Sequence, residues 1–364
     1  MLIDGNSEFF QEVVDWLSDR VQGRHSLAKR TTTITYELGP GSTVTDWYWK
    51  RPFFFTRERD PNPSQLRVKE SIIIRTVGWS CTPLKELLEK IGSWSAGRKK
   101  YSLSIKRPAS KECDGNQGRW YLDRSCAPRR LETVILDEEL KRDVIDDVRS
   151  YIADAETYAR RGIPYRRGYL FYGPPGTGKS SFALALASHF QLEVYTLSLA
   201  ERSMTDVEIR VLFGRTRKPS MIILEDIDSA GLQREQQGSP DGVTLSGLLN
   251  VIDGAGAVEG RVLIMTTNHL ENLDPALIRP GRIGRRVELP LATKAQAKRM
   301  FMVHYELPKS NPLVDKFENG IPETSLSPAS IQNHFIKNMD DPDAAVGSLA
   351  ELVKENGECG LTSD

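Results

Sequence analysis

Residues 173–180 have the composition and spacing of a phosphate-binding loop. They read Gly-Pro-Pro-Gly-Thr-Gly-Lys-Ser, which satisfies G-x-x-x-x-G-K-[ST], and they lie between an apolar run, 169–172, and a helix-like run, 181–190. Glycines allow successive backbone N–H groups to turn inward around phosphates, and the positive end of the following helix faces the same charge. A chance glycine-rich turn would not need this order of strand, loop and helix. The segment therefore predicts a nucleoside triphosphate site.

Two side chains of the loop have chemical roles in this interpretation. Lys179 is expected to meet the β- and γ-phosphates, and Ser180 is expected to ligate Mg2+. The residues assigned to nucleotide binding are Gly173, Pro174, Pro175, Gly176, Thr177, Gly178, Lys179, Ser180 and Ser181.

An apolar strand, expected at residues 220–225, ends in carboxylates. A phosphate-loop enzyme needs such groups to hold Mg2+ and to polarise water. Without the loop upstream, they would be interpreted as a solvated strand end. We assign Glu225 to the Mg2+ shell and Asp226 to the attacking water. ATPases of this type more often have Asp before Glu, so the order found here leaves open which carboxylate has which role.

The next expected strand, 261–266, is followed closely by Asn268. A side-chain amide at this place can contact both the γ-phosphate and the lytic water, which makes Asn268 a candidate sensor. The alternative is an asparagine that only turns the chain.

Four arginines occupy eight positions between 279 and 286. A guanidinium that reaches a γ-phosphate stabilises the charge of the transition state. Arg282 and Arg285 are the candidates for this finger, and we expect them to act on the nucleotide of a neighbouring subunit. The alternative is a solvated basic turn.

Composition limits the possible functions. The chain has 364 residues, enough for about two to three domains, and its 49 basic and 49 acidic residues cancel. No global field therefore attracts nucleic acid or anionic lipid, and partners must be recognised locally. The four cysteines form no C-x-x-C pair, and no apolar run approaches the ~18 residues of a membrane span or the pattern of a signal peptide. We expect the chain as written to be soluble.

The pattern of elements changes near residue 130. Before it, the sequence indicates a smaller α+β domain, with helices at 9–17 and 83–91 and strands at 31–37, 71–77 and 101–106. After an amphipathic helix at 137–161, apolar strands alternate with helices, which indicates an α/β fold with a parallel sheet covered on both faces. Ligands of such sheets bind at the carboxyl ends of the strands. The strands are expected at 169–172, 193–198, 220–225, 261–266 and 286–289, with helices at 206–216 and 244–252.

Three further helical stretches, near 294–304, 328–338 and 343–355, indicate a helical lid after the sheet. The expected domains are therefore residues 1–130, 131–290 and 291–364.

Together these features resemble the AAA ATPases. The sequences at 162–170, 224–228, 245–254 and 265–269 narrow the resemblance to one subfamily, the mitochondrial inner-membrane chaperones that translocate the folded Rieske iron-sulfur protein for cytochrome bc complex assembly. Segments 327–332 and 341–345 of the lid also fit, as does Trp120 followed by residues 129–134. The resemblance covers about residues 8–355.

This resemblance implies a fold, an activity and partners. It implies an AAA core with a helical lid, ATP and Mg2+ as ligands, ATP hydrolysis, a homo-oligomeric ring, heptameric in the family, and a folded protein cargo such as the Rieske protein. It also implies the mitochondrial inner membrane, with attachment only through an upstream helix that this chain does not contain. Gly284 stands where the family usually has Asp, so Arg285 is a less secure finger than Arg282.

Two other function classes are weighed against this one. The Glu225–Asp226 order allows a nucleotide-gated assembly scaffold with little turnover. A nucleic-acid-remodelling ATPase would need a basic groove with stacking aromatics, and the aromatic cluster at 47–55 is better explained by alternating strand packing, so we expect no nucleic acid partner. The loop at 199–205, where unfolding machines carry a gripping aromatic, has none, which favours ring cycling around a folded cargo.

Overall fold

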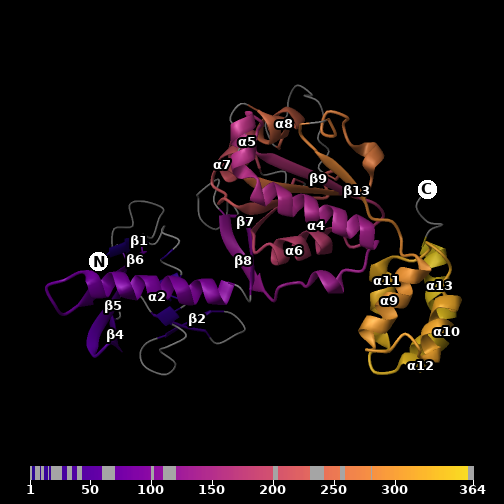
Figure 1. The fold of residues 1–364 in the computed structure, drawn as a ribbon, viewed down its shortest axis with the longest axis horizontal. Coiled ribbons are helices and arrows are strands. Elements are labelled where there is room, and N and C mark those ends of the chain that lie inside the picture. The colour runs from indigo at the N-terminus through magenta and orange to yellow at the C-terminus, as the bar shows by residue number, and fades with distance from the viewer. Residues whose placement is uncertain are drawn as a thin grey trace. The chain divides into compact units, whose positions relative to one another are not determined.

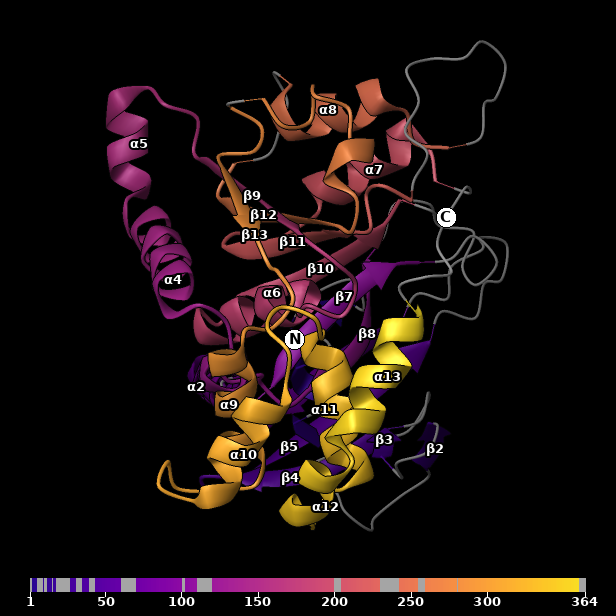
Figure 2. The same ribbon diagram turned by 90° about the vertical axis from the view of Figure 1, so that its right-hand side faces the viewer.

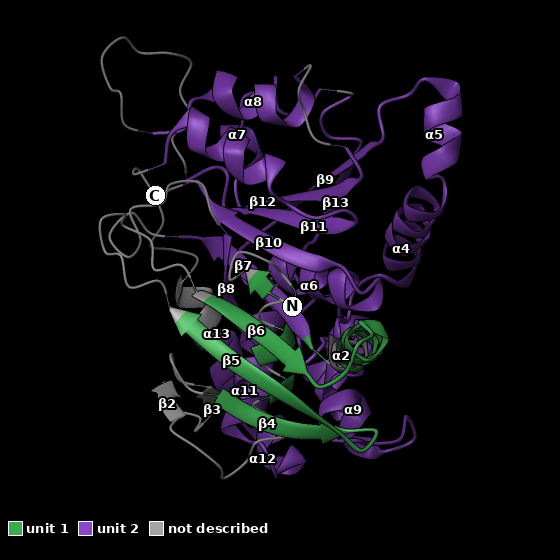
Figure 3. Cartoon of the chain, turned by 90° about the vertical axis from the view of Figure 1, so that its left-hand side faces the viewer, with its two compact units in different colours: residues 1–102, 110–115 green, residues 103–109, 116–364 purple. Residues whose placement is uncertain are grey.

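Close contacts divide the chain into two units, drawn in green and purple in Figure 3. In this computed structural model the first unit contains residues 1–102 and 110–115, and the second contains residues 103–109 and 116–364. The structure describes residues 2–4, 9, 12–14, 16–17, 27–30, 35–38, 43–59, 70–99, 102–109, 120–199, 204–229, 242–254, 259–279 and 281–359.

A seven-stranded sheet organises the second unit. Its order is β13, β9, β12, β11, β10, β7 and β8, and all neighbours are parallel except the antiparallel pair β7 and β8. Parallel neighbours need long crossover connections, which here carry helices. The strands are β7 (Leu103–Pro108), β8 (Trp120–Cys126), β9 (Arg166–Tyr172), β10 (Glu193–Ser198), β11 (Ser220–Glu225), β12 (Arg261–Thr267) and β13 (Arg285–Glu288).

Helices cover both faces of this sheet (Figure 2). Phe171 lies in a core with residues of α4 and α6, whereas its neighbour Leu170 lies in a second core with residues of α7 and α8. Because alternate residues of a strand face opposite sides, a strand buried on both faces is apolar along most of its length. The covering helices are α4 (Glu138–Ala153), α6 (Lys179–His189), α7 (Asp206–Gly214) and α8 (Leu245–Asp253).

Side-chain caps begin these helices. The Thr205 hydroxyl accepts from the backbone N–H of Glu208, whose carboxylate accepts from the backbone N–H of Thr205, and this reciprocal pair starts α7. Asp137 accepts from the Leu140 backbone and starts α4. The single helix expected at 137–161 is instead two helices, because the backbone leaves helical geometry at Asp154 before α5 (Ala155–Arg161).

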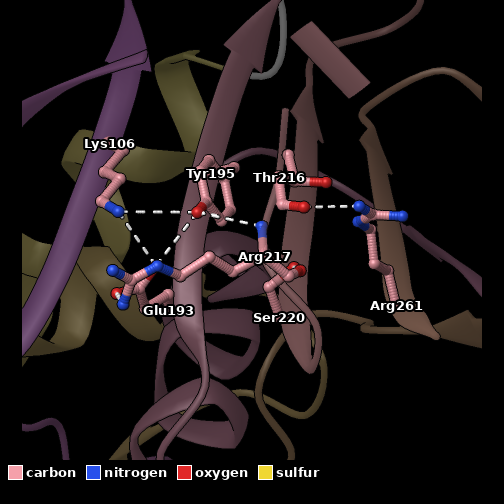
Figure 4. Close-up of polar contacts among 7 residues, drawn as sticks. All are labelled: Lys106, Glu193, Tyr195, Thr216, Arg217, Ser220 and Arg261. Atoms are coloured by element: carbon pink, nitrogen blue, oxygen red, sulfur yellow. Dashed lines mark hydrogen bonds and ion pairs between the residues drawn. The ribbon is translucent and has the colours of Figure 1, made fainter. Parts of the chain in front are cut away.

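Strand β7 joins the sheet of the second unit through a polar network (Figure 4). The Lys106 ammonium lies 2.9 Å from the carboxylate of Glu193, which also pairs with Arg217 at 3.1 Å. The hydroxyl of Tyr195 donates to Glu193 and accepts from the backbone of Arg217, and burial raises its pKa. This network holds β7 beside β10, at the end of the sheet where the parallel strands begin.

Strand β8 completes that side of the sheet. The indole N–H of Trp120 donates to the carbonyl of Leu212 on α7 at 2.8 Å, and its ring lies edge-on against Tyr195 with a centroid distance of 4.9 Å. The expected domain boundary near residue 130 therefore lies after two strands that belong to the sheet of the second unit. The sequence did not predict this pairing, because an alternating apolar pattern predicts a strand but not the strand with which it pairs.

Among the residues described after β13, five helices form the lid. Phe301 stacks on Phe317 with a centroid distance of 4.3 Å, and Phe335 lies 5.8 Å from Phe301. Thr293 and Gln296 form a capping box at the first helix. The helices are α9 (Lys294–His304), α10 (Pro312–Gly320), α11 (Pro328–Lys337), α12 (Pro342–Gly347) and α13 (Leu349–Cys359); α10 was not expected from the sequence, and the stretch expected at 343–355 is two helices.

The first unit is an antiparallel sheet packed against a helix. The sheet order is β1, β6, β5, β4, and the core contains Phe53, Phe55 and Ile74 from the strands with Leu87 from α2. Helical residues within 9–17 add Trp16 to this core. The elements are β1 (Leu2–Asp4), β4 (Thr43–Tyr48), β5 (Arg51–Arg59), β6 (Glu70–Thr76) and α2 (Thr82–Lys99), with a separate hairpin of β2 (Leu27–Arg30) and β3 (Thr35–Leu38).

This architecture confirms the expected fold class: a parallel α/β core with helices on both faces, a helical lid, and a smaller unit of strands and helix (Figure 1). The division into three domains at 130 and 290 stays a prediction. None of the helices in the described residues combines the length and apolar character that a membrane span requires.

We expect Phe301→Ala to unfold the lid more easily, because it removes a fully buried ring from the centre of its core. Deleting such a ring lowers the free energy of unfolding by about 3–5 kcal/mol. Denaturant titration followed by circular dichroism measures the change. The matched control is Val303→Ala on the same helix, where the side chain is 51% exposed and we expect a change below about 0.5 kcal/mol. Equal effects of the two variants would contradict this account of the core.

Candidate functional site

The predicted nucleotide-binding residues meet at one edge of the parallel sheet. Strand β9 ends at Tyr172 and leads into the loop at 173–180, and Thr267 at the end of β12 pairs with Tyr172. Glu225 ends β11, whose Leu224 pairs with Met265 of β12. Parallel strands in this register end on the same side, so residues that follow them are neighbours in space.

The loop can follow this path because of its glycines. Gly173 has φ +138°, and a Cβ added there would lie 2.2 Å from the carbonyl oxygen of Leu289. Gly178 precedes α6 with φ +96°, in the left-handed region that favours glycine. The Thr177 hydroxyl donates to the carbonyl of Pro174 at 2.9 Å and ties the two sides of the loop together. The loop is therefore preformed around its own backbone.

Lys179 lies inside this loop with only 7% of the residue exposed. Its ammonium donates to the carbonyls of Gly173 at 2.6 Å and Pro174 at 2.8 Å. Burial lowers the pKa of Lys179, and the charges of Asp226 and Asp228 oppose that shift. A cation held by neutral carbonyls near carboxylates suits a phosphate chain, because the carbonyls can be exchanged for anionic oxygens.

The residues present fit a magnesium nucleotide. The glycine-rich loop leads directly into α6, which begins at Lys179. The amino terminus of a helix attracts phosphate. Ser180 lies in the first turn of that helix and Glu225 ends β11, which are the two positions expected to hold Mg2+. Within the described residues no group of three or more His, Cys, Asp or Glu side chains could hold a metal ion alone.

The acidic strand end has an unusual backbone. Asp226 has φ +47°, a conformation that residues other than glycine seldom adopt, and its side chain is exposed. Its backbone N–H donates to the hydroxyl of Thr266 at 3.2 Å, and the N–H of Ile227 donates to the Thr266 carbonyl at 3.1 Å. Neighbouring β12 thus holds the strained turn. Strain of this kind persists where the surroundings impose it, often at functional sites.

Thr267 connects the acidic turn to the candidate sensor. Its hydroxyl donates to the Asp228 carboxylate at 2.9 Å and accepts from the backbone N–H of His269 at 3.0 Å. Asn268 lies between these partners in sequence and is half-buried. One hydroxyl therefore fixes the turn that carries Asn268 relative to Asp226 and Asp228. Neither Thr267 nor Asp228 was singled out from the sequence, although both stand beside residues that were.

The two arginines predicted to act in the neighbouring subunit have partners within their own chain. The guanidinium of Arg282 lies 3.1 Å from the Asp253 carboxylate and donates to the carbonyl of Ala276 at 2.7 Å. Arg285 donates to the carboxylate of Asp143 on α4 at 2.6 Å. Both side chains fix the segment between β12 and β13 against the core.

Arg279 differs from these two arginines. It is exposed, and its guanidinium forms no hydrogen bond or ion pair with any residue that the structure describes. Its carbonyl accepts from the backbone of Arg282 at 3.1 Å, so the turn is formed while the side chain is left outside. Sequence reasoning counted Arg279 among the four arginines but did not single it out. Its lack of a partner in the described part of the chain separates it from Arg282 and Arg285. Exposed Arg286 shares this property but lies within β13, whereas Arg279 lies in the bend that precedes that strand.

The lid contacts the loop directly. The backbone N–H of Ala329, in the first turn of α11, donates to the carbonyl of Gly176 at 3.1 Å. Ser327 caps the same helix through the backbone of Ser330. The amino terminus of α11 therefore lies beside the predicted phosphate site. The stretch at 200–203, part of the loop without an aromatic, lies outside the described residues, as does Pro280.

Three family models match the chain. The ATPase family associated with various cellular activities (AAA) matches residues 169–291, the BCS1 N terminal model matches residues 1–134, and the mitochondrial chaperone BCS1-like ATPase lid domain matches residues 294–351.

Named relatives agree with these models. The chain is 35% identical over 301 residues to the probable mitochondrial chaperone BCS1-A of Dictyostelium discoideum, covering 79% of this chain and 69% of that protein. It is 40% identical over 261 residues to BCS1-B of the same organism, covering 63% and 57%. It is 38% identical over 239 residues to the mitochondrial chaperone BCS1 of Homo sapiens, covering 62% and 56%. The matched segments thus span between 56% and 69% of these three relatives.

We expect Thr267→Val to loosen the turn that carries Asn268, because valine keeps the shape but removes both hydrogen bonds of the hydroxyl. Amide hydrogen exchange across residues 268–272 should become faster. The rate of ATP hydrolysis should fall about tenfold with little change in KM, since leaving Asp228 without its donor costs about 1–3 kcal/mol.

The conservative variant Thr267→Ser retains a hydroxyl and should restore both measurements. If Thr267→Ser behaves like Thr267→Val, or if exchange at 268–272 is unchanged in both, the hydroxyl does not position the turn.

Proposed function

The chain belongs to the BCS1-like AAA ATPases, and from this premise we propose that it hydrolyses ATP in a homo-oligomeric ring that moves or assembles a folded protein. The single observation that carries the proposal is the convergence of a buried lysine, two carboxylates and an amide-bearing turn at one sheet edge. Such an arrangement binds a triphosphate and positions the water that cleaves it.

Each residue has a proposed role in that reaction. Lys179 exchanges its loop carbonyls for the β- and γ-phosphates, and the backbone of residues 173–181 surrounds the phosphate chain. Ser180 and Glu225 would hold Mg2+, which neutralises charge on the phosphates when bound. Asp226 orients or activates the attacking water, and Asn268 detects the γ-phosphate. Because the order of Glu225 and Asp226 is reversed, the opposite assignment of the two roles is the alternative. Comparing Glu225→Gln with Asp226→Asn distinguishes the two assignments.

A guanidinium from the neighbouring subunit completes the proposed site. Arg282 and Arg285 were the expected donors, but their pairing with Asp253 and Asp143 means that either must break an ion pair to reach a neighbour. Arg279 has no such bond to break within the described residues. Arg286 also has no such bond, but it lies within β13, where pairing with β9 holds its backbone. We therefore add Arg279 as the first candidate and keep Arg282 and Arg285 as the alternatives.

The cargo and the place of action are inferred from the family. The relatives are named mitochondrial chaperones, which supports a mitochondrial location and a protein substrate for this chain. A heptameric ring, the Rieske iron-sulfur protein as cargo and attachment to the inner membrane through an upstream helix are the corresponding proposals. Contact between α11 and Gly176 supports coupling of the nucleotide to the lid, because a change at the loop reaches the lid through one hydrogen bond.

A nucleotide-gated scaffold is the second candidate. The observation that favours it is the exposed, strained Asp226 together with a lysine that donates to its own loop. The scaffold would bind nucleotide and assemble without appreciable hydrolysis, so turnover separates the two candidates.

We expect Lys179→Ala to abolish binding of a fluorescent ATP analogue, because it removes the cation inside the loop. Asp226→Asn should retain binding but lower kcat about 100-fold or more, since the amide cannot accept the proton of water. Phosphate release by the purified chain measures turnover. Asp146→Asn, which changes an exposed carboxylate on α4, is the matched control and should leave both quantities unchanged.

Equal and negligible turnover in wild type, Lys179→Ala and Asp226→Asn would support the scaffold and contradict the motor.

We expect Arg279→Ala to lower kcat by about a thousandfold or more if its guanidinium acts between subunits. The decisive measurement is mixing: Arg279→Ala and Lys179→Ala subunits are each inactive alone, but co-assembly pairs an intact loop with an intact Arg279. Turnover should then reappear. Arg286→Ala, at another exposed arginine of the same segment, serves as the control, and Arg282→Ala and Arg285→Ala are compared with both. Failure of every mixture to regain activity would exclude action between subunits.

A further inference from the structure

The hairpin turn between β4 and β5 is occupied by residues that such a turn disfavours. Trp49 has φ +47° and Lys50 has φ +62°, and these two residues alone connect Tyr48 to Arg51. Two-residue turns with both φ values positive are filled best by Asn-Gly. A bulky residue in this conformation is an outlier. Strain of this kind points to a use for the side chains themselves.

Tryptophan side chains are exposed around this turn. Trp47 is 64% exposed, Trp49 is 52% exposed, and Trp79 is fully exposed. Trp79 lies at the same end of the sheet, because Thr76 at the end of β6 pairs with Phe53, and a Cβ added at Gly78 would lie 3.5 Å from the Arg51 guanidinium. Figure 3 shows the β4–β5 turn and the end of β6 at one end of the green sheet. We call Trp47, Trp49, Lys50, Arg51, Val77 and Trp79 the tryptophan tip.

The fold of this unit does not use these indoles for its core. Tyr48, Phe53 and Phe55 are the inward-facing aromatics of the hairpin, and all three are buried beside Trp16 or each other. Trp49 contacts Tyr48 edge-on, with the Lys90 ammonium 5.9 Å from its ring, and still remains half exposed. Exposed apolar groups of this size gather where a surface binds something.

The charges of the tip are mainly basic. Lys50 and Arg51 are both exposed, and Lys90 lies over the ring of Tyr48. The nearest acidic residue in sequence, Asp46, is half-buried and accepts from the backbone of Trp47 at 2.9 Å. Glu86 and Glu89 on α2 are exposed, and the adjacent Lys85 and Lys90 offset their charge.

We propose that the tryptophan tip inserts into the headgroup region of an anionic lipid surface. Indoles favour that region because one end of the ring is apolar and the N–H is wet, while Lys and Arg attract anionic headgroups. The hairpin turn presents exposed indoles beside exposed Lys50 and Arg51, which is the combination that shallow insertion into an anionic headgroup layer requires.

The test uses the full chain and two kinds of vesicle, phosphatidylcholine alone and phosphatidylcholine with about a third phosphatidylglycerol. We expect flotation with the anionic vesicles, a blue shift of tryptophan emission, and weaker binding at high salt. The double variant Trp49→Asn, Lys50→Gly should bind at least about fivefold more weakly, since one basic residue alone contributes about that factor. The same variant should raise the melting temperature, because Asn-Gly suits the turn.

Two further variants keep the result independent of folding effects. Trp79→Ser removes a fully exposed indole outside the strained turn and should also weaken vesicle binding. Tyr121→Thr, at an exposed aromatic of the second unit, should not. The proposal is overturned if the wild-type chain does not bind anionic vesicles, or if the tip variants bind them as well as the wild type does. It is also overturned if the tip variants lose self-association instead of vesicle binding, which would assign the tip to a second copy of the chain. Nucleotide binding should be equal in all variants, so failure here is distinct from failure of the proposed ATPase function.

Discussion

Parallel pairing of β9, β11 and β12 is the constraint on which the candidate site depends. Thr267 opposes Tyr172 and Leu224 opposes Met265, so the phosphate loop, the acidic turn and the Asn268 turn all begin at the same sheet edge. No single segment contains the site. A register shift between β11 and β12 would separate Thr266 from the turn that it holds and Thr267 from Asp228.

Electrostatic balance at this edge stabilises the loop around Lys179. An ammonium buried without partners would be costly, but Lys179 is satisfied by two carbonyls and lies near two carboxylates. Phosphates can replace the carbonyls without a change in the charge of the lysine. Strain is confined to the neighbouring turn at Asp226, where hydrogen bonds from β12 hold the backbone. The site thus combines a relaxed anion cradle with a constrained acidic turn.

The sequence predicts the second unit better than the first, for a physical reason. Strands buried on both faces are largely apolar, so the strands at 193–198 and 220–225 were predicted with the bounds that the structure has. The loop around Lys179 was predictable because its glycines and lysine occur at the fixed spacing that this backbone conformation requires. The partner of β7 was not predictable, since a Lys106 to Glu193 contact joins positions far apart in sequence. The same limit applies to Arg282 and Arg285, whose types indicate a guanidinium and whose partners appear only in three dimensions.

Strands β7 and β8 have a consequence for where this protein can be divided. The chain passes between the two units after residues 102, 109 and 115, so the units are interleaved in sequence. An ATPase fragment starting after Cys126 would lack both strands, and β10, although still paired with β11, would become an edge strand on the side that β7 occupies. A bare strand edge of that kind recruits other chains and drives aggregation. The smallest soluble ATPase fragment must therefore retain β7 and β8, and with them part of the segment that matches the amino-terminal family model.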